Sequence, residues 1–247
     1  MASSTKPPDL RAEKGLLRAG HALVAACDEV GRGAVGGPVS VGMVLVDATV
    51  KRPLAGVRDS KLLSPAARIA MVPKIRRWVV GYAVGHATAA EIDEFGIMAA
   101  LRMAGIRAML MLPAQPDIVL LDGNYDWLST PVQPSLFDDL AAAQDAVCPN
   151  RRSLKVTTMI KADMKCSSVG AASILAKTER DAMMVDLAMV HPGYGWEVNK
   201  GYATAAHMDA LRHLGPSTHH RQSWRLPERM PADAAGDSLI PDTGDYL

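Results

Sequence analysis

Two adjacent carboxylates, Asp28 and Glu29, follow an apolar run and are followed at once by a glycine-flanked arginine, Arg32. Adjacent acids repel each other, and burying a charge is costly unless it is paired or neutralised. The run before them, residues 21–27, predicts a buried strand, so we expect both carboxylates at the end of that strand. A positively charged group or ion is therefore expected beside them.

Two further acids come after later apolar runs. Asp122 ends the run DIVLLD, and Asp163 ends LKVTTMIKAD. Parallel strands share an edge at their carboxyl ends, where open α/β folds place their sites, so three strand ends could bring four carboxylates together. Such a cluster cannot stay ionised without cations, and hard oxygen ligands suit Mg²⁺ or Mn²⁺. Paired divalent ions are a standard arrangement for hydrolysing a phosphodiester.

Each acid taken alone also has a structural interpretation. An Asp-Gly pair after a strand is most often a turn, and Asp163 before a helix could belong to an N-terminal cap. The functional interpretation therefore depends on the coincidence of the three strand ends.

The hydrophobic pattern predicts an α/β layered fold. Strands are expected over residues 21–27, 39–46, 79–88, 117–123 and 154–163, and helices over 10–18, 65–76, 89–110, 168–189 and 202–214. The first three strands are expected to form a meander, and the later strands to be joined by crossovers.

Composition is that of a soluble globular chain of 247 residues, with 49% hydrophobic residues and a net charge of +1. No apolar run is long enough to span a bilayer, and the first residues do not read as a secretory signal. The odd set Cys27, Cys148 and Cys166 matches neither a disulfide framework nor a zinc site, which favours a reducing cytoplasm. Nucleic acid could be bound only through local basic clusters, such as residues 74–77 and 219–225.

Several motifs in one order resemble the type 2 ribonuclease H family in its bacterial form. They are DEVGRG, GGPVSVGMVLV, RDSKLLS, LLDGN, AASILAKTERDAMM, HPGYGW and NKGYATAAHMDALRHLGPSTHHRQSW. The resemblance covers about residues 22–226. It implies an RNase H-like fold, with a five-stranded mixed sheet, helices on both faces and a helical C-terminal region. It also implies an endonuclease that cuts the RNA strand of RNA/DNA hybrids and cuts 5′ to a single ribonucleotide in duplex DNA, leaving a 3′-hydroxyl and a 5′-phosphate.

The resemblance implies the catalytic residues. Matched to the family motifs, the acids that bind two Mn²⁺ or Mg²⁺ ions and catalyse cleavage would be Asp28, Glu29, Asp122 and Asp163.

Substrate contacts are implied in the same way. The loop Gly31-Arg32-Gly33 would read the 2′-hydroxyl at the RNA–DNA junction, and bare backbone can indeed approach a ribose closely. Tyr202 of the KGY motif would stack on the following deoxyribose and so reject RNA there. Lys61 of the DSK motif would contact a phosphate near the cleavage point.

Residues around these motifs have two interpretations each. Ser173 and Lys177, four apart on a predicted helix, either support the metal site or belong to a face of small residues that packs on the sheet. Arg221 is expected to fix the C-terminal segment on the core rather than to meet substrate backbone. Because two-metal chemistry needs no histidine, structural or phosphate-side roles are expected for His191, His207, His219 and His220.

The chain divides into an N-terminal extension with a short helix (1–20), a catalytic domain (21–226, with its helical C-terminal segment from about 190) and an acidic tail (227–247) expected to be disordered. The segment between Asp122 and Asp163 is longer than the family usually shows. Within it, Gln133, Leu136 and Phe137 resemble the Gln-x-x-Leu-Phe peptides that dock on the bacterial sliding clamp. Alternatively, the two apolar residues staple the insertion to the body. A monomer is expected.

Three rival functions stay open at this point. A small-molecule phosphatase would explain the acids but not the glycine-rich loop, which has no Walker-type lysine. A non-catalytic nucleic-acid-binding protein would not need all four acids. Another nuclease or recombinase could share the fold, since fold does not fix function.

Overall fold

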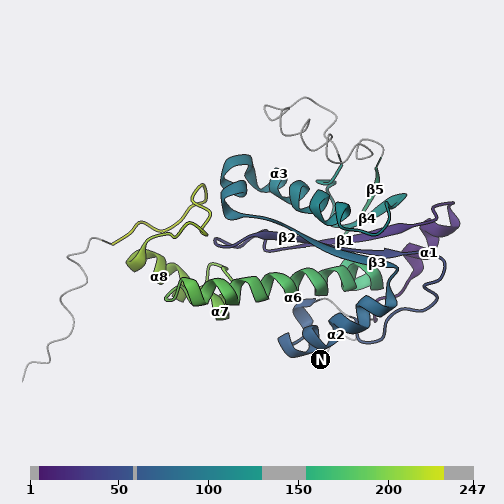
Figure 1. Ribbon diagram of the computed structural model, residues 1–247, viewed down its shortest axis with the longest axis horizontal. Coiled ribbons are helices and arrows are strands. Elements are labelled where there is room, and N and C mark those ends of the chain that lie inside the picture. The colour runs from purple at the N-terminus through teal and green to yellow at the C-terminus, as the bar shows by residue number, and fades with distance from the viewer. Residues whose placement is uncertain (1–5, 58–59, 130–153, 231–247) are drawn as a thin grey trace, which may run out of the picture.

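The computed structural model describes residues 6–57, 60–129 and 154–230 of the 247. Its centre is a five-stranded sheet with the order β3-β2-β1-β4-β5 (Figure 1). Strands β1 (Val24–Val30), β2 (Val39–Val46) and β3 (Gly81–Ala87) form an antiparallel meander. Strands β4 (Ile118–Asp122) and β5 (Lys155–Met159) continue the sheet parallel to β1. The expected RNase H-like arrangement of a mixed sheet is confirmed.

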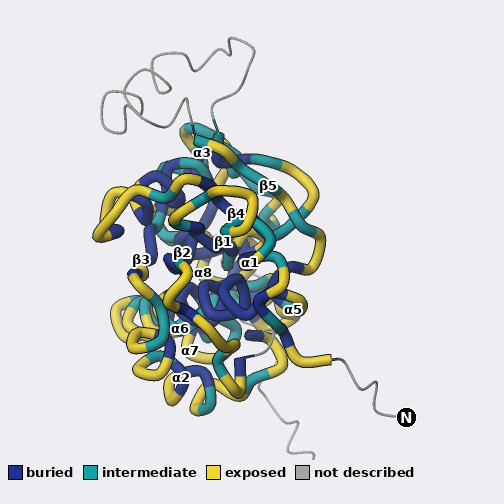
Figure 2. Tube along the Cα trace, turned by 90° about the vertical axis from the view of Figure 1, so that its right-hand side faces the viewer, coloured by how far each residue is buried: buried dark blue, intermediate teal, exposed yellow. Residues whose placement is uncertain are grey.

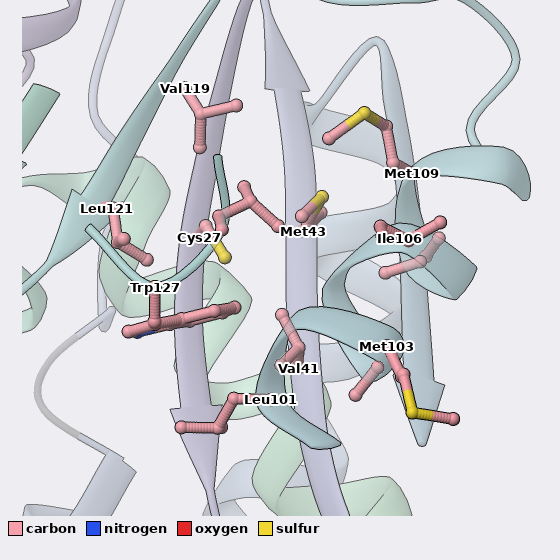
Figure 3. Close-up of a cluster of buried hydrophobic side chains, with 14 of the residues drawn as sticks. Cys27, Val41, Met43, Leu101, Met103, Ile106, Met109, Val119, Leu121 and Trp127 are labelled. Carbon is pink, nitrogen blue, oxygen red and sulfur yellow. The ribbon is translucent and has the colours of Figure 1, made fainter. Parts of the chain in front are cut away.

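Two long helices cover the two faces of the sheet (Figure 1). Helix α3 (Ala89–Leu110) packs on the face that carries Cys27 and Met43, and these side chains gather with those of α3 in one buried cluster (Figure 3). Helix α6 (Ser167–Val190) packs on the opposite face, against Ala26 and Val44. Since side chains alternate between the faces of a strand, β1 and β2 are buried on both sides and read as continuous apolar runs.

Shorter helices surround this core. They are α1 (Arg11–Arg18), the 3₁₀ turn η1 (Ser60–Leu62), α2 (Pro65–Trp78), α5 (Ala162–Lys165), α7 (Trp196–Asn199) and α8 (Ala205–Leu214). Helix α2 starts as predicted, because the Ser64 hydroxyl accepts the Ala67 amide at 3.2 Å, and it continues past Pro73. The expected helical C-terminal region is also confirmed: α7 and α8 pack at the end of α6 around the buried Trp196.

Helix α1 is bound to the body of the protein. Glu13 is buried and accepts hydrogen bonds from the amide and hydroxyl of Ser168, at the start of α6. The central strands and the first half of α6, residues 167–176, are buried (Figure 2). The division at residue 20 stays a prediction. In the described part of the chain, no helix is both long and apolar enough to cross a membrane.

The carboxyl ends of β1 and β5 differ from the prediction by three and four residues, and β1 also begins at Val24 rather than at residue 21. β1 does not end at Cys27 but runs on to Val30, because its pairing with β2 continues to Val30 and Ser40 after its pairing with β4 has stopped at Cys27 and Leu121. β5 ends at Met159 instead of reaching residue 163. Asp28 and Glu29 therefore lie within a strand, and Asp163 lies beyond one.

The close approach of α6 to β2 depends on Gly42. A Cβ at this position would overlap the carbonyl oxygen of Ala172 and lie 3.1 Å from the Cβ of Ala176. We expect Gly42→Ala to lower the free energy of unfolding by about 2 kcal/mol or more, because backbone cannot move aside as a flexible side chain can. Urea unfolding measures this. Gly15→Ala on α1 is the control, since it has nothing within 4 Å and should be neutral or stabilising. Equal stability of Gly42→Ala and wild type would contradict the packing.

Candidate active site

The first and fourth strands bring two of the predicted acids together. Cys27 pairs with Leu121 across β1 and β4, so the next residues, Asp28 and Asp122, occupy corresponding positions on neighbouring strands. Both lie on the face opposite Cys27 and Leu121, which is the face that α6 covers. Parallel strands lie about 4.8 Å apart, so these two carboxylates are neighbours.

Asp28 is the most strongly perturbed of the acids. It is only 7% exposed, and burial is the largest cause that raises the pKa of its carboxyl from 3.8 to about 8. A hydrogen bond from Ser173 on α6 opposes this rise, and the Glu29 amide donates to Asp28 Oδ1 at 2.8 Å. Three nearby charges raise the pKa further: those of Glu29, Asp122 and Asp163. The other three predicted acids therefore all act on Asp28.

Asp163 reaches this group by a turn rather than on a strand. After β5, Lys161 adopts a left-handed conformation (φ 56°), which non-glycine residues rarely do. Asp122 Oδ1 then accepts the amide of Ala162, the first residue of α5, at 2.6 Å. The carboxylate of Asp122 thus holds the short helix that carries Asp163, which is itself 8% exposed.

Glu29 is half-buried and paired with the loop that follows it. Burial raises the pKa of its carboxyl, and the charge of Arg32 lowers it in return. Arg32 Nη1 lies 3.5 Å from Glu29 Oε1, and the arginine side chain is 53% exposed. Because the arginine is largely exposed to water and the separation is long, the pair is weak, and Arg32 can leave it at little cost.

The donor set suits a hard divalent cation. Among the described residues, no three His, Cys, Asp or Glu side chains are arranged, as they stand, so that they could hold a metal ion. Three of the acids are turned to partners within the protein: Asp28 to Ser173, Glu29 to Arg32, and Asp122 to the backbone. Their oxygens are nevertheless the ligands that Mg²⁺ and Mn²⁺ prefer. A bound cation would offset the cost of burying the charge of Asp28 and the repulsion from the neighbouring acids. Each carboxylate has two oxygens, so one oxygen can keep its present partner while the other binds a cation.

The two glycines of the GRG loop differ in their surroundings. Gly31 is buried with φ +82°, and a Cβ there would overlap the guanidinium of Arg180. Gly33 is exposed, its φ is not positive, and a Cβ there would have nothing within 4 Å. The fold therefore requires a glycine at 31 but not at 33.

The KGY segment is hydrogen bonded to the chain that follows the GRG loop. The carbonyl of Gly201 accepts the amides of Val35 at 2.9 Å and Gly36 at 3.1 Å. Next to it, the Tyr202 ring lies 5.5 Å from the guanidinium carbon of Arg180. The two segments predicted to contact substrate therefore form one structural unit.

Lys61 is exposed on η1, beside the buried Ser60. The Ser60 hydroxyl lies 2.9 Å from that of Ser173, so η1 is connected to Asp28 through two serines. Ser173 thus supports Asp28 directly. Lys177, in contrast, pairs with Asp181 at 2.6 Å and not with the acids.

His207, His220 and Arg221 have structural positions. His207 and His220 are fully buried and 3.1 Å apart, and the Trp196 indole donates to His207 at 3.0 Å. Arg221 is also fully buried and donates to backbone carbonyls of the GRG loop, so its expected structural role is confirmed. Sequence reasoning missed Arg180, a fully buried arginine of α6.

Comparisons with known proteins match most of the chain. A family model described as Ribonuclease HII matches residues 25–226. The chain is 39% identical over 227 residues to a ribonuclease HII of Streptomyces avermitilis, covering 92% of this chain and 87% of that protein.

Solved structures give the same result. The ribonuclease H2 of Pyrococcus horikoshii matches with a TM-score of 0.59 and 27% identity, over 82% of this chain and 93% of that one. A ribonuclease HII of Archaeoglobus fulgidus, solved as a complex with PCNA, matches with a TM-score of 0.59 and 26% identity, over 85% of this chain and 99% of that one. With the matching family model and these relatives, the chain belongs to the ribonuclease HII family.

Proposed function

We propose that this protein is a metal-dependent endoribonuclease that cuts RNA in RNA/DNA hybrids and cuts 5′ to single ribonucleotides embedded in duplex DNA, giving a 3′-hydroxyl and a 5′-phosphate. Membership of the ribonuclease HII family supports a ribonuclease H activity on RNA/DNA. The observation that carries the finer proposal is the placement of Asp28 and Asp122 in one register, beside a loop joined to the KGY segment.

In this proposal Asp28, Glu29, Asp122 and Asp163 are the catalytic acids and hold two Mn²⁺ or Mg²⁺ ions. Bound ions of this kind stabilise the attacking and the leaving oxygen of a phosphodiester. Within the chain, Ser173 orients Asp28 by its hydrogen bond, and the strongly raised pKa of Asp28 means that a nearby positive charge is needed to keep it ionised at neutral pH.

Ribose recognition is assigned to backbone rather than side chains. In the described part of the chain, the amides of Arg32 and Gly33 have no hydrogen-bond partner, and both residues are exposed. Amides of this kind can donate to a 2′-hydroxyl, which a deoxyribose lacks. Tyr202 is the residue that stacks on the next sugar, and Lys61 is the phosphate contact.

The test of this assignment compares two variants of Tyr202. Tyr202→Ala is expected to lower cleavage of a DNA duplex with one ribonucleotide about tenfold more than cleavage of an RNA/DNA hybrid, because only in the first substrate is the ribonucleotide at the cut followed by a deoxyribose. A tenfold change is about 1.4 kcal/mol of barrier. Tyr202→Phe keeps the ring and is the matched control, with a ratio close to wild type. Initial rates on the two labelled duplexes give the ratio. Equal losses on both substrates with Tyr202→Ala would reject the role of the tyrosine.

Partners beyond nucleic acid rest on the sequence. Docking on a sliding clamp through Gln133, Leu136 and Phe137 stays a prediction, and these residues lie outside the described ranges. The Archaeoglobus relative, whose structure is a PCNA complex, supports a clamp partner in general. A monomeric state and a cytoplasmic location are likewise proposals drawn from the sequence.

A further inference from the structure

Two fully buried arginines from distant parts of the chain meet at the segment of residues 31–38, which includes the GRG loop. Arg221, near the C-terminal end of the described chain, donates from Nη2 to the Gly31 carbonyl at 2.6 Å and from Nη1 to the Arg32 carbonyl at 2.8 Å. It also reaches the Gly37 carbonyl, at 3.2 Å. Its guanidinium carbon lies 4.8 Å from the Trp224 ring, which helps to fix its plane.

Arg180 binds the other end of the same segment. From α6 it donates to the carbonyls of Pro38 at 2.8 Å and Gly36 at 3.2 Å. Its third bond goes to the carbonyl of Lys200 at 2.9 Å, in the KGY segment. One side chain therefore joins the 31–38 segment to the residues beside Tyr202.

Backbone carbonyl oxygens stabilise these two charges by hydrogen bonds. Among the described residues, no carboxylate lies within ion-pair distance of either guanidinium. Burial lowers the pKa of both arginines, and the charge of Arg180 lowers that of Arg221 further. An isolated buried charge is very costly, so moving the loop carbonyls away would leave both arginines uncompensated. The loop conformation and the arginines hold each other in place.

This arrangement sets the direction of the amides. In a trans peptide the C=O and the N–H point in opposite directions, and no described peptide is cis. Because Arg221 draws the carbonyls of Gly31 and Arg32 inward, the amides that share those peptides, of Arg32 and Gly33, point away from the buried guanidinium. Those are the amides without partners in the described part of the chain.

We propose that Arg221 and Arg180 are positioning residues, which never touch the reacting atoms but fix the carbonyls of the 31–38 segment inward and so aim the amides of Arg32 and Gly33 at the ribose of the substrate. The substrate part of this inference rests on the proposed function. The lock on the loop itself rests only on the contacts above.

Arg221→Lys is the decisive variant. Lysine keeps the positive charge but lacks the planar fork that holds two carbonyls at once. Arg107→Lys is the control, since Arg107 of α3 also donates to a carbonyl, that of His86, and pairs with Glu91, while none of its hydrogen bonds goes to residues 31–38. Both are placed in an Asp28→Asn background, so that binding is measured without turnover. Arg180→Lys is the second variant, to be used in the same way if Arg221→Lys does not fold.

Binding is measured by fluorescence anisotropy in Mg²⁺, with a DNA duplex that carries one ribonucleotide and with the same duplex in all-DNA form. Arg221→Lys is expected to reduce the preference for the ribonucleotide, the ratio of the two Kd values, about tenfold, while Arg107→Lys leaves the ratio unchanged. An equal loss of affinity for both duplexes would show a merely structural arginine and overturn the proposal.

Hydrogen exchange separates this inference from the proposed function. The amides of Val35 and Gly36 donate to the Gly201 carbonyl, and the amide of Gly37 donates to the His219 carbonyl. Arg221→Lys is expected to speed the exchange of these three amides, whereas Arg107→Lys is not. If the parent protein shows no preference for the ribonucleotide, the proposed junction reading fails, and the exchange rates still decide whether Arg221 holds the loop. Unchanged exchange in Arg221→Lys would overturn the lock.

Discussion

Replacing Asp28 with asparagine is expected to abolish cleavage and, at the same time, to make the metal-free protein more stable. The pKa of Asp28 is raised from 3.8 to about 8, with burial as the main cause. Between these two values the folded protein keeps a proton that the unfolded chain has lost, so stability falls as the pH rises through this window and levels off above it. Each pKa unit corresponds to about 1.4 kcal/mol. Asparagine carries no charge and should remove this loss.

Urea unfolding in EDTA at pH 5 and pH 8 measures the stability part. The stability advantage of Asp28→Asn over wild type should widen from pH 5 to pH 8, whereas Asp186→Asn, at an exposed carboxylate of the same α6, should show no such change. A pH-independent difference would mean that ionisation of Asp28 does not cause the loss of stability. For cleavage, a loss smaller than tenfold, about 1.4 kcal/mol of barrier, would contradict a metal-ligand role.

Replacement by alanine is expected to lower the stability of the protein at Gly31 but not at Gly33. Gly31→Ala should lower the free energy of unfolding by about 2 kcal/mol or more, because its φ of +82° disfavours a side chain and the added methyl would displace the buried Arg180. Gly33→Ala should leave stability unchanged within about 0.5 kcal/mol, because its surroundings are open. Thermal and urea unfolding of the two variants test this contrast.

For cleavage, Gly33→Ala is the informative variant, because it is expected to keep its fold. Gly33→Ala places a methyl group on the exposed side of the loop, where the ribose is proposed to approach, and we expect at least a tenfold loss on a duplex with one ribonucleotide, about 1.4 kcal/mol of barrier, in a fully folded protein. A wild-type rate for Gly33→Ala would place the ribose elsewhere. Wild-type stability for Gly31→Ala would contradict the contact with Arg180.

Much of the fold could be predicted from hydrophobic pattern, since strand 39–46 and helix 89–110 match the structure residue for residue. The ends of β1 and β5 could not. The end of β1 depends on which neighbour continues to pair with it, and β5 is followed by a turn in which Lys161 is left-handed and Asp122 binds the next helix. Contacts between residues 40 positions apart in the chain leave no local pattern.

The candidate site shows the same division. The four acids could be found because each follows an apolar run, and the structure gives the electrostatic coupling between them. Arg180 could not be found, because it stands between Glu179 and Asp181 and so looks like part of a solvated helix face. Its partners are backbone carbonyls, which have no side-chain signal in a sequence.

The most direct test of the central claim is the cut position of the wild-type protein on a DNA duplex with one internal ribonucleotide, beside an all-DNA duplex and an RNA/DNA hybrid. With Mg²⁺ or Mn²⁺, we predict one cut 5′ to the ribonucleotide that leaves a 5′-phosphate, cleavage of the hybrid, no cleavage of the all-DNA duplex, and no cleavage of any duplex in EDTA. Cleavage of the hybrid with no cut at the ribonucleotide would contradict junction reading by Gly31–Gly33 and Tyr202. Cleavage that persists in EDTA would contradict the role of the four acids.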